Sequence, residues 1–109
     1  MTSLARHGYE IHRGVFTCDE IDLLRNEADH VASKASTICV RHLRDRSKIF
    51  RELSVSEKIH NLLSASDFRP IRSILFDKTA TENWPVAWHQ DLTICTKQEI
   101  PTEGYGPWS

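Results

Sequence analysis

The sequence has few cysteines, no long apolar run and almost no net charge, and each of these shortages disfavours a class of protein. Cys18, Cys39 and Cys95 are odd in number, lie far apart and form no CxxC pair, so we expect a reducing compartment rather than a disulfide framework. The apolar runs are far shorter than the ~20 residues that cross a bilayer, and the first residues lack the apolar stretch of a secretory signal. With 14 basic and 15 acidic side chains, the net charge of −1 disfavours binding to nucleic acid. We therefore expect a cytoplasmic protein without a membrane or nucleic-acid partner.

The 109 residues correspond to one domain or to part of one. Hydrophobic residues make up 39% and charged residues 27%, which is typical of a globular rather than a disordered chain. Helical patterns come first, over about residues 17–66. Strand patterns follow over about 70–96, and residues 97–109 form a loop tail with two glycines and two prolines. This order of helices before strands predicts an α+β fold.

The clearest predicted element is an amphipathic helix over residues 18–34. Thr17 and Glu20 have capping-box spacing, in which the hydroxyl accepts from a first-turn N–H and the carboxylate reaches back to the start of the helix. Behind this cap, apolar residues recur at helical spacing and form one stripe: Ile21, Leu24, Ala28 and Val31. The stripe predicts that one face of the helix packs against the core.

Shorter elements are expected between this helix and Pro70. Residues 38–40 favour a short strand. Ser47 is expected to cap a short helix whose apolar residues point inward: Ile49, Phe50 and Leu53. Ser54 and Glu57 repeat the capping-box spacing and predict a further helix. The apolar face of that helix would be made by Val55, Ile59, Leu62 and Leu63.

A basic stretch lies in the same region: Arg41, His42, Arg44, Arg46 and Lys48. Such a stretch could face an anionic substrate. A charged face in contact with solvent is the other explanation, and the sequence leaves both open.

Two strands are predicted in the second part of the chain, over residues 71–79 and 86–94. Within the second strand His89 and Asp91 stand at positions i and i+2, so their side chains leave the same face. An imidazole and a carboxylate at this spacing could hold one divalent ion, and a second histidine would complete the facial triad of a non-haem Fe(II) oxygenase. The alternative is a structural histidine whose ring is hydrogen-bonded to a neighbouring carbonyl.

The segment SILFDKTATENWPVAWHQDLTI, residues 73–94, resembles the phytanoyl-CoA dioxygenase family of Fe(II)- and 2-oxoglutarate-dependent enzymes. In that family a strand ending in an FDK-like segment is followed by a loop and then by a WHQD-type metal strand. Weaker similarity extends over nearly the whole chain, through Gly8, residues 14–16, residues 20–29 and residues 104–108. The resemblance implies a double-stranded β-helix, or jelly roll, of which this chain holds the first strands. It also implies hydroxylation of a small organic substrate, with Fe(II) bound by His89 and Asp91 and 2-oxoglutarate as cosubstrate.

The resemblance directs attention to further residues beside the predicted ligands. Lys78 could reach a bound 2-oxoglutarate or an anionic group of the substrate, or be an exposed lysine at a strand end. Thr93 shares the strand parity of the two ligands and could contact the cosubstrate, whereas Gln90 points the other way and could hydrogen-bond across the sheet or face the helices. Lys78, Gln90 and Thr93 are therefore the candidate cofactor-binding residues. Trp88 could wall the metal site or belong to the core.

The sequence departs from the family beyond the metal strand. The family needs a later histidine as third iron ligand and a basic residue that pairs with 2-oxoglutarate, but the 18 residues after Asp91 contain no histidine and no arginine. We therefore expect an amino-terminal fragment of a dioxygenase, completed by a missing carboxy-terminal segment or a second chain and inactive alone. Open strand edges and partly uncovered aromatic residues would then favour self-association. The alternative is a non-catalytic remnant or partner-binding module without metal; a zinc hydrolase is a poorer option because no third ligand or general base is evident.

Overall fold

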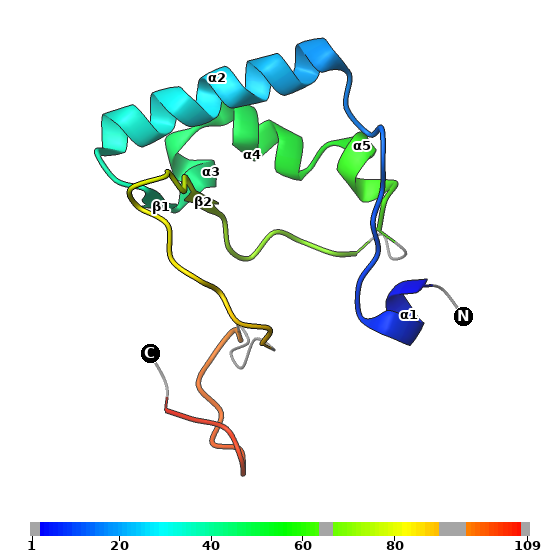
Figure 1. Cartoon of the computed structure of the whole chain (residues 1–109). Helices are drawn as coiled ribbons and strands as arrows, with labels where there is room; N and C mark the ends of the chain where they lie inside the picture. The colour runs from blue at the N-terminus through cyan, green and yellow to red at the C-terminus, as the bar shows by residue number, and fades with distance from the viewer. Residues whose placement is uncertain (1–2, 64–66, 90–95, 108–109) are drawn as a thin grey trace.

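The computed structural model describes residues 3–63, 67–89 and 96–107 and is a mixed helical and sheet structure (Figure 1). The elements in chain order are α1 (Ser3–His7), α2 (Cys18–Ala35), β1 (Cys39–Arg41), α3 (Leu43–Arg46), α4 (Lys48–Ser54), α5 (Glu57–His60) and β2 (Ile74–Phe76). Helices and a small antiparallel sheet are both present, and the α+β prediction is confirmed at this level, although β1 lies between α2 and α3. The sheet found in the described residues has two strands, so the predicted jelly roll is not formed within them.

Helix α2 begins at the predicted cap. The Thr17 N–H donates to Glu20 Oε2 at 2.8 Å, and the Glu20 N–H donates to Thr17 Oγ1 at 3.2 Å, so both halves of the capping box are present. The helix ends at Ala35, and its C-cap residue Ser36 has a left-handed φ of 52°. The predicted stripe becomes more buried toward the end of the helix: Ile21 is 39% exposed and Val31 only 4%. Burial increases in this direction because β1 packs against α2.

The core of the described part lies where α2 meets the sheet. Its buried apolar residues are Val31, Val40 and Leu43, and the apolar residues packed around them are Ala35, Phe50 and Leu75. Each contributing element supplies only one or two side chains to this core, and the strands have only three residues each. The result is a small core under one end of α2.

The two strands are antiparallel and pair Val40 with Leu75. Beyond them, Asp77 N donates to Ile38 O at 2.8 Å and Leu43 N donates to Ser73 O at 3.2 Å. The prediction of a strand over residues 71–79 was too long, since only Ile74–Phe76 is strand. A strand needs a partner along its length, and β1 offers three residues before the chain turns into α3.

Three short helices, α3, α4 and α5, follow β1. Ser47 caps α4 as predicted, because its hydroxyl accepts from Phe50 N at 3.2 Å. The predicted cap at Ser54 was wrong: Ser54 is the last residue of α4, and its hydroxyl donates to Arg51 O at 2.7 Å. Ser56 caps α5 instead. Val55, expected on the apolar face of that helix, lies between the two helices and is exposed.

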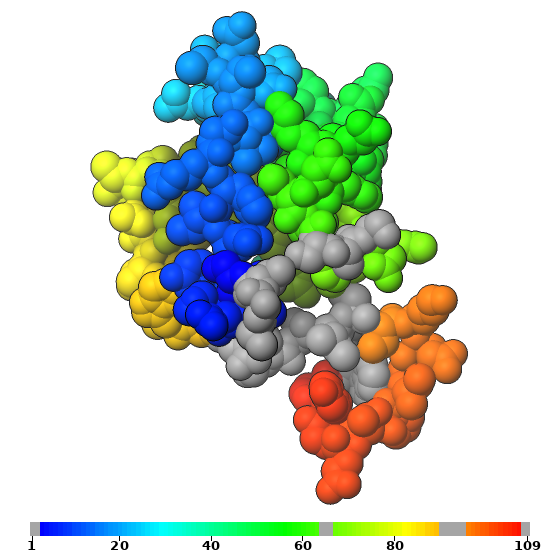
Figure 2. Space-filling view, turned by 90° about the vertical axis from the view of Figure 1, so that its right-hand side faces the viewer, coloured from blue at the N-terminus to red at the C-terminus, as the bar shows by residue number. Residues whose placement is uncertain are grey.

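The second part of the chain leaves the sheet after β2. Residues 86–89 are in no strand, so this portion of the predicted 86–94 strand was wrong, and residues 90–94 lie outside the described ranges. Residues 96–107 contain turns but no helix or strand, as predicted for the tail, and they project from one end of the molecule (Figure 2).

The molecule is less compact than a globular domain of the same length. Its Cα radius of gyration is 16.6 Å, whereas a compact domain of about 100 residues has ~13 Å. Its accessible surface is 9900 Å², against roughly 6200 Å² for a compact protein of this mass. In the part of the chain that is described, no helix combines the length and the apolar character that a membrane span requires.

Candidate functional site

The predicted ligand His89 lies on an exposed segment without helix or strand, at the end of the second described range. Its Nδ1 lies 2.8 Å from the carbonyl oxygen of Ala87. A carbonyl can only accept, so Nδ1 carries the proton, and in the neutral ring the lone pair is on Nε2. This is the hydrogen bond expected of a structural histidine. It is also the bond by which metal-binding histidines fix the tautomer that presents Nε2 to the metal.

The other predicted residues of the metal strand are Gln90, Asp91 and Thr93, and they lie outside the described residues. The strand that was expected to place His89 and Asp91 on one face is not formed over residues 86–89. Among the residues that the structure describes, no three His, Cys, Asp or Glu side chains gather closely enough to hold a metal ion. The described part of the site therefore offers one imidazole donor.

Lys78 closes the loop that leads from β2 to His89. Its Nζ donates to the carbonyl oxygen of Trp84 at 2.7 Å and lies 4.6 Å from the centroid of the Trp84 ring. Phe76 packs edge-on against the same indole, with ring centroids 5.8 Å apart. The loop is tightened further by Thr79, whose N–H donates to Glu82 O at 3.2 Å. The ammonium predicted to meet 2-oxoglutarate is thus engaged within its own loop, and its contact with the cosubstrate stays a prediction.

Trp88 is fully exposed, with a relative accessibility of 103%. It therefore neither walls a closed site nor belongs to the core in the described structure. Val86, two residues earlier, is also exposed at 60%. This segment therefore presents the apolar surface of an indole and a valine to the solvent.

The basic stretch after β1 is mostly used for local contacts. Arg46 Nε donates to Arg41 O at 3.0 Å, and Lys48 pairs with Glu52 at 3.6 Å on an exposed face. Arg44 differs, since it is half-buried and its Nε donates to Ser54 Oγ at 2.8 Å. Most of the stretch is therefore a solvated face, and only Arg44 turns inward.

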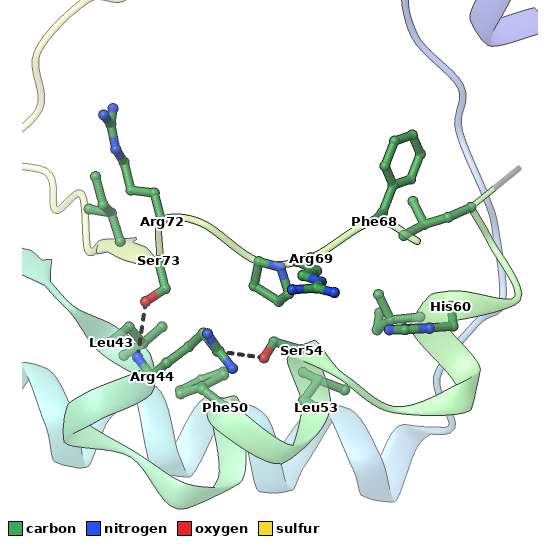
Figure 3. Close-up of a pocket in the computed structure, with 14 residues that line it drawn as sticks. Leu43, Arg44, Phe50, Leu53, Ser54, His60, Phe68, Arg69, Arg72 and Ser73 are labelled. Atoms are coloured by element: carbon green, nitrogen blue, oxygen red, sulfur yellow. Dashed lines mark hydrogen bonds between the residues drawn. The ribbon is translucent and has the colours of Figure 1, made fainter. Parts of the chain in front are cut away.

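Arg44 lines a cavity of about 720 Å³ that the sequence did not indicate (Figure 3). One wall is made by α3, α4 and α5, and the other by residues 68–74 on the way into β2. The described lining includes three arginines and a histidine: Arg44, Arg69, Arg72 and His60. The rest is mainly apolar, and none of the described lining residues is acidic. The two walls come from different parts of the sequence, which explains why no local pattern predicted the cavity.

A second unpredicted feature joins α5 to the start of α2. Lys58 Nζ lies 2.7 Å from both carboxylate oxygens of Glu20 and 5.2 Å from the centroid of the Phe16 ring. The hydrogen bond from Lys58, together with the one from the Thr17 backbone N–H, lowers the pKa of Glu20 below its ordinary value of 4.5. The ionised carboxylate thus serves both as helix cap and as a tie between two helices.

No family model, curated protein or solved structure compared with this chain matches it. Its function is therefore inferred from its own residues.

Proposed function

We propose that the chain is part of an Fe(II)- and 2-oxoglutarate-dependent dioxygenase that hydroxylates a small organic substrate, with His89 and Asp91 as two of its three iron ligands. The observation that carries the proposal is the hydrogen bond from His89 Nδ1 to the Ala87 carbonyl oxygen, 2.8 Å long. It selects the tautomer in which Nε2 can bind a metal. The carboxylate two residues later completes a His and Asp donor pair of the kind that non-haem Fe(II) sites use.

In this proposal the residues of the chain bind and orient the metal ion, and they do not themselves carry out the oxidation. The Ala87 carbonyl holds the proton on Nδ1, which makes Nε2 the nitrogen through which the neutral ring would bind the metal. Asp91 contributes a negative charge that offsets part of the charge of the metal. When bound, Fe(II) supplies the oxidising chemistry together with 2-oxoglutarate and dioxygen. Because protons compete with the metal for its ligands, metal affinity should weaken in acid.

The third ligand and the 2-oxoglutarate-binding arginine would come from polypeptide beyond these 109 residues, either a further segment or a second chain. That polypeptide would also add the strands that complete a jelly roll around β2 and residues 86–94. The large accessible surface of 9900 Å² and the exposed side chains of Phe76, Val86 and Trp88 support this part of the proposal. Phe76 lies in β2, and Val86 and Trp88 lie in residues 86–89. The added strands would cover both of these segments.

Metal titration of the 109-residue chain tests the ligand pair. Mn²⁺ is the probe, and enhancement of water-proton relaxation reports its binding. We expect weak binding that His89→Ala and Asp91→Asn each reduce by at least ~10-fold, because even an outer partner of a ligand contributes that much. The matched control is His30→Ala, which removes an exposed histidine from α2. If His30→Ala reduces binding as much as His89→Ala does, the proposed pair is not the site.

Turnover tests the incomplete site. The purified chain should form no succinate from 2-oxoglutarate in the presence of Fe(II), because two of the required residues are missing. Addition of the completing polypeptide should restore succinate formation in the wild type but not in His89→Ala. Succinate formation by the 109-residue chain alone would contradict the expected lack of a third ligand.

A second candidate function is a partner-binding module that uses no metal. The small core, with Val31, Val40 and Leu43 as its buried apolar residues in the described ranges, favours it because such a core needs an external surface to pack against. The two candidates differ in metal dependence. A module without metal requires equal thermal stability of His89→Ala and wild type with and without Mn²⁺, whereas the dioxygenase proposal requires Mn²⁺ to stabilise only the wild type.

A further inference from the structure

We infer that the cavity between α3–α5 and residues 68–74 binds a hydrophobic monocarboxylate, at a site separate from the proposed metal segment. The cavity belongs entirely to residues 43–74, which precede the Lys78–Trp84 loop and His89 in the chain. Its volume of about 720 Å³ lies within the range of small-molecule sites.

The apolar part of the ligand would lie on the helices. Leu43, Phe50 and Leu53 form the floor seen in Figure 3, and Ile59 and Leu63 continue it toward α5. This lining favours a hydrocarbon group over a sugar or a nucleotide, because polar groups placed on it would lose water without gaining partners.

The charged end of the ligand would meet Arg44 and Arg69. The Nε–Ser54 hydrogen bond of 2.8 Å holds the Arg44 guanidinium in place, and its terminal nitrogens bond to no described residue. Arg69 forms no hydrogen bond or ion pair with the described residues either, and Figure 3 shows it on the helix side of its own segment. Two guanidinium groups on facing walls can each donate two N–H groups to a carboxylate.

Charge complementarity decides the sign of the ligand. The described lining holds three arginines and no Asp or Glu, so it would repel a cation and attract an anion. A neutral ligand would leave the half-buried guanidinium of Arg44 without a partner. Arg72 has a different place: it borders the cavity, but its side chain points away from the helices in Figure 3. It is therefore a matched control for Arg69 on the same segment.

Calorimetric titration of the 109-residue chain with sodium decanoate tests the inference. We expect saturable binding that Arg69→Gln weakens by about tenfold and Arg72→Gln by less than about twofold. Decan-1-ol should bind more weakly than decanoate to the wild type and equally to wild type and Arg69→Gln. Shortening the probe from decanoate to octanoate should weaken binding by about fourfold for each methylene removed.

Three results would each overturn the inference. They are equal affinity for decanol and decanoate, equal losses in Arg69→Gln and Arg72→Gln, and an affinity independent of chain length. Both substituted arginines are exposed, so the variants are expected to fold. A far-ultraviolet circular dichroism spectrum identical to that of the wild type checks this before titration. The test does not involve His89, so its outcome is independent of the proposed metal site.

Discussion

Lys58 and Glu20 tie the fifth helix to the first turn of α2, with Nζ 2.7 Å from both carboxylate oxygens. The same carboxylate accepts the Thr17 N–H that begins α2. One ionised side chain thus satisfies a helix terminus and a tertiary contact together. Protonation of Glu20 weakens both interactions.

The first prediction is a loss of stability in acid that depends on this pair. The folded state lowers the pKa of Glu20 below 4.5, so the stabilisation is present above that pH and is lost as the pH falls through the lower folded-state value. Urea midpoints measured between pH 6 and pH 3 should fall less steeply in Glu20→Gln than in wild type. Lys58→Met should flatten the profile too, since it removes the largest cause of the shift. An unchanged profile in both variants would contradict the role of the pair.

The second prediction compares two helix caps. Ser47 is only 2% exposed; its hydroxyl caps α4 and also donates to Glu27 Oε1 at 2.5 Å. Ser47→Ala should therefore cost about 2 kcal/mol, the sum of a lost cap and a lost hydrogen bond. Ser56→Ala removes the α5 cap without a link to α2 and should cost about 1 kcal/mol. Urea unfolding measures both, and equal losses would show that the Glu27 bond adds nothing.

The third prediction concerns the small core. Leu43 is 8% exposed and packs with Val31 and Val40. Leu43→Ala should cost about 3 kcal/mol, because the site offers few neighbours to close the resulting cavity. Leu23→Ala changes a leucine that is 55% exposed on α2 and should alter stability by less than ~0.5 kcal/mol. Thermal unfolding followed by circular dichroism distinguishes them, and similar melting temperatures for the two variants would place the core elsewhere.

The fourth prediction concerns the loop before His89. Lys78→Met removes the hydrogen bond to the Trp84 carbonyl and the contact with its ring. Together these contribute about 1 kcal/mol at an exposed site, so hydrogen exchange at the amides of Thr79 and Glu82 should become about fivefold faster. Lys97→Met changes an exposed lysine in the tail and should leave those amides unaffected. Unchanged exchange in Lys78→Met would mean that the turn holds without the lysine.

Sequence reasoning succeeded where the determining contacts are local. The α2 helix and its Thr17 and Glu20 cap were predicted because capping and periodicity act within one or two turns. Ser47 was identified as a cap for the same reason. Ser54 was misassigned because capping depends on where α4 ends, and α4 continues to Ser54, whose hydroxyl meets Arg51 O and Arg44 Nε.

Sequence reasoning failed where distant segments decide the structure. The strand over 71–79 was too long because the length of β1 limits it, and a single strand carries no information about its partner's length. The arginine-lined cavity lies between α3–α5 and residues 68–74. Neither of these two segments carries a sequence motif that predicts it. At the candidate site, His89 and its hydrogen bond to the Ala87 carbonyl are described, while Asp91, the other half of the pattern, lies outside the described residues.

The pairing of β1 with β2 has a consequence for the order of assembly. Val40 pairs with Leu75 across the sheet, and the ribosome adds Leu75 only after α3, α4 and α5 have been made. During synthesis, α2 is therefore complete while the apolar side chains that Leu75 will contact are still exposed. They stay exposed until Phe76 has left the exit tunnel. A pause in translation ahead of Ile74 would prolong that exposed interval, when chaperones have the best access to the chain.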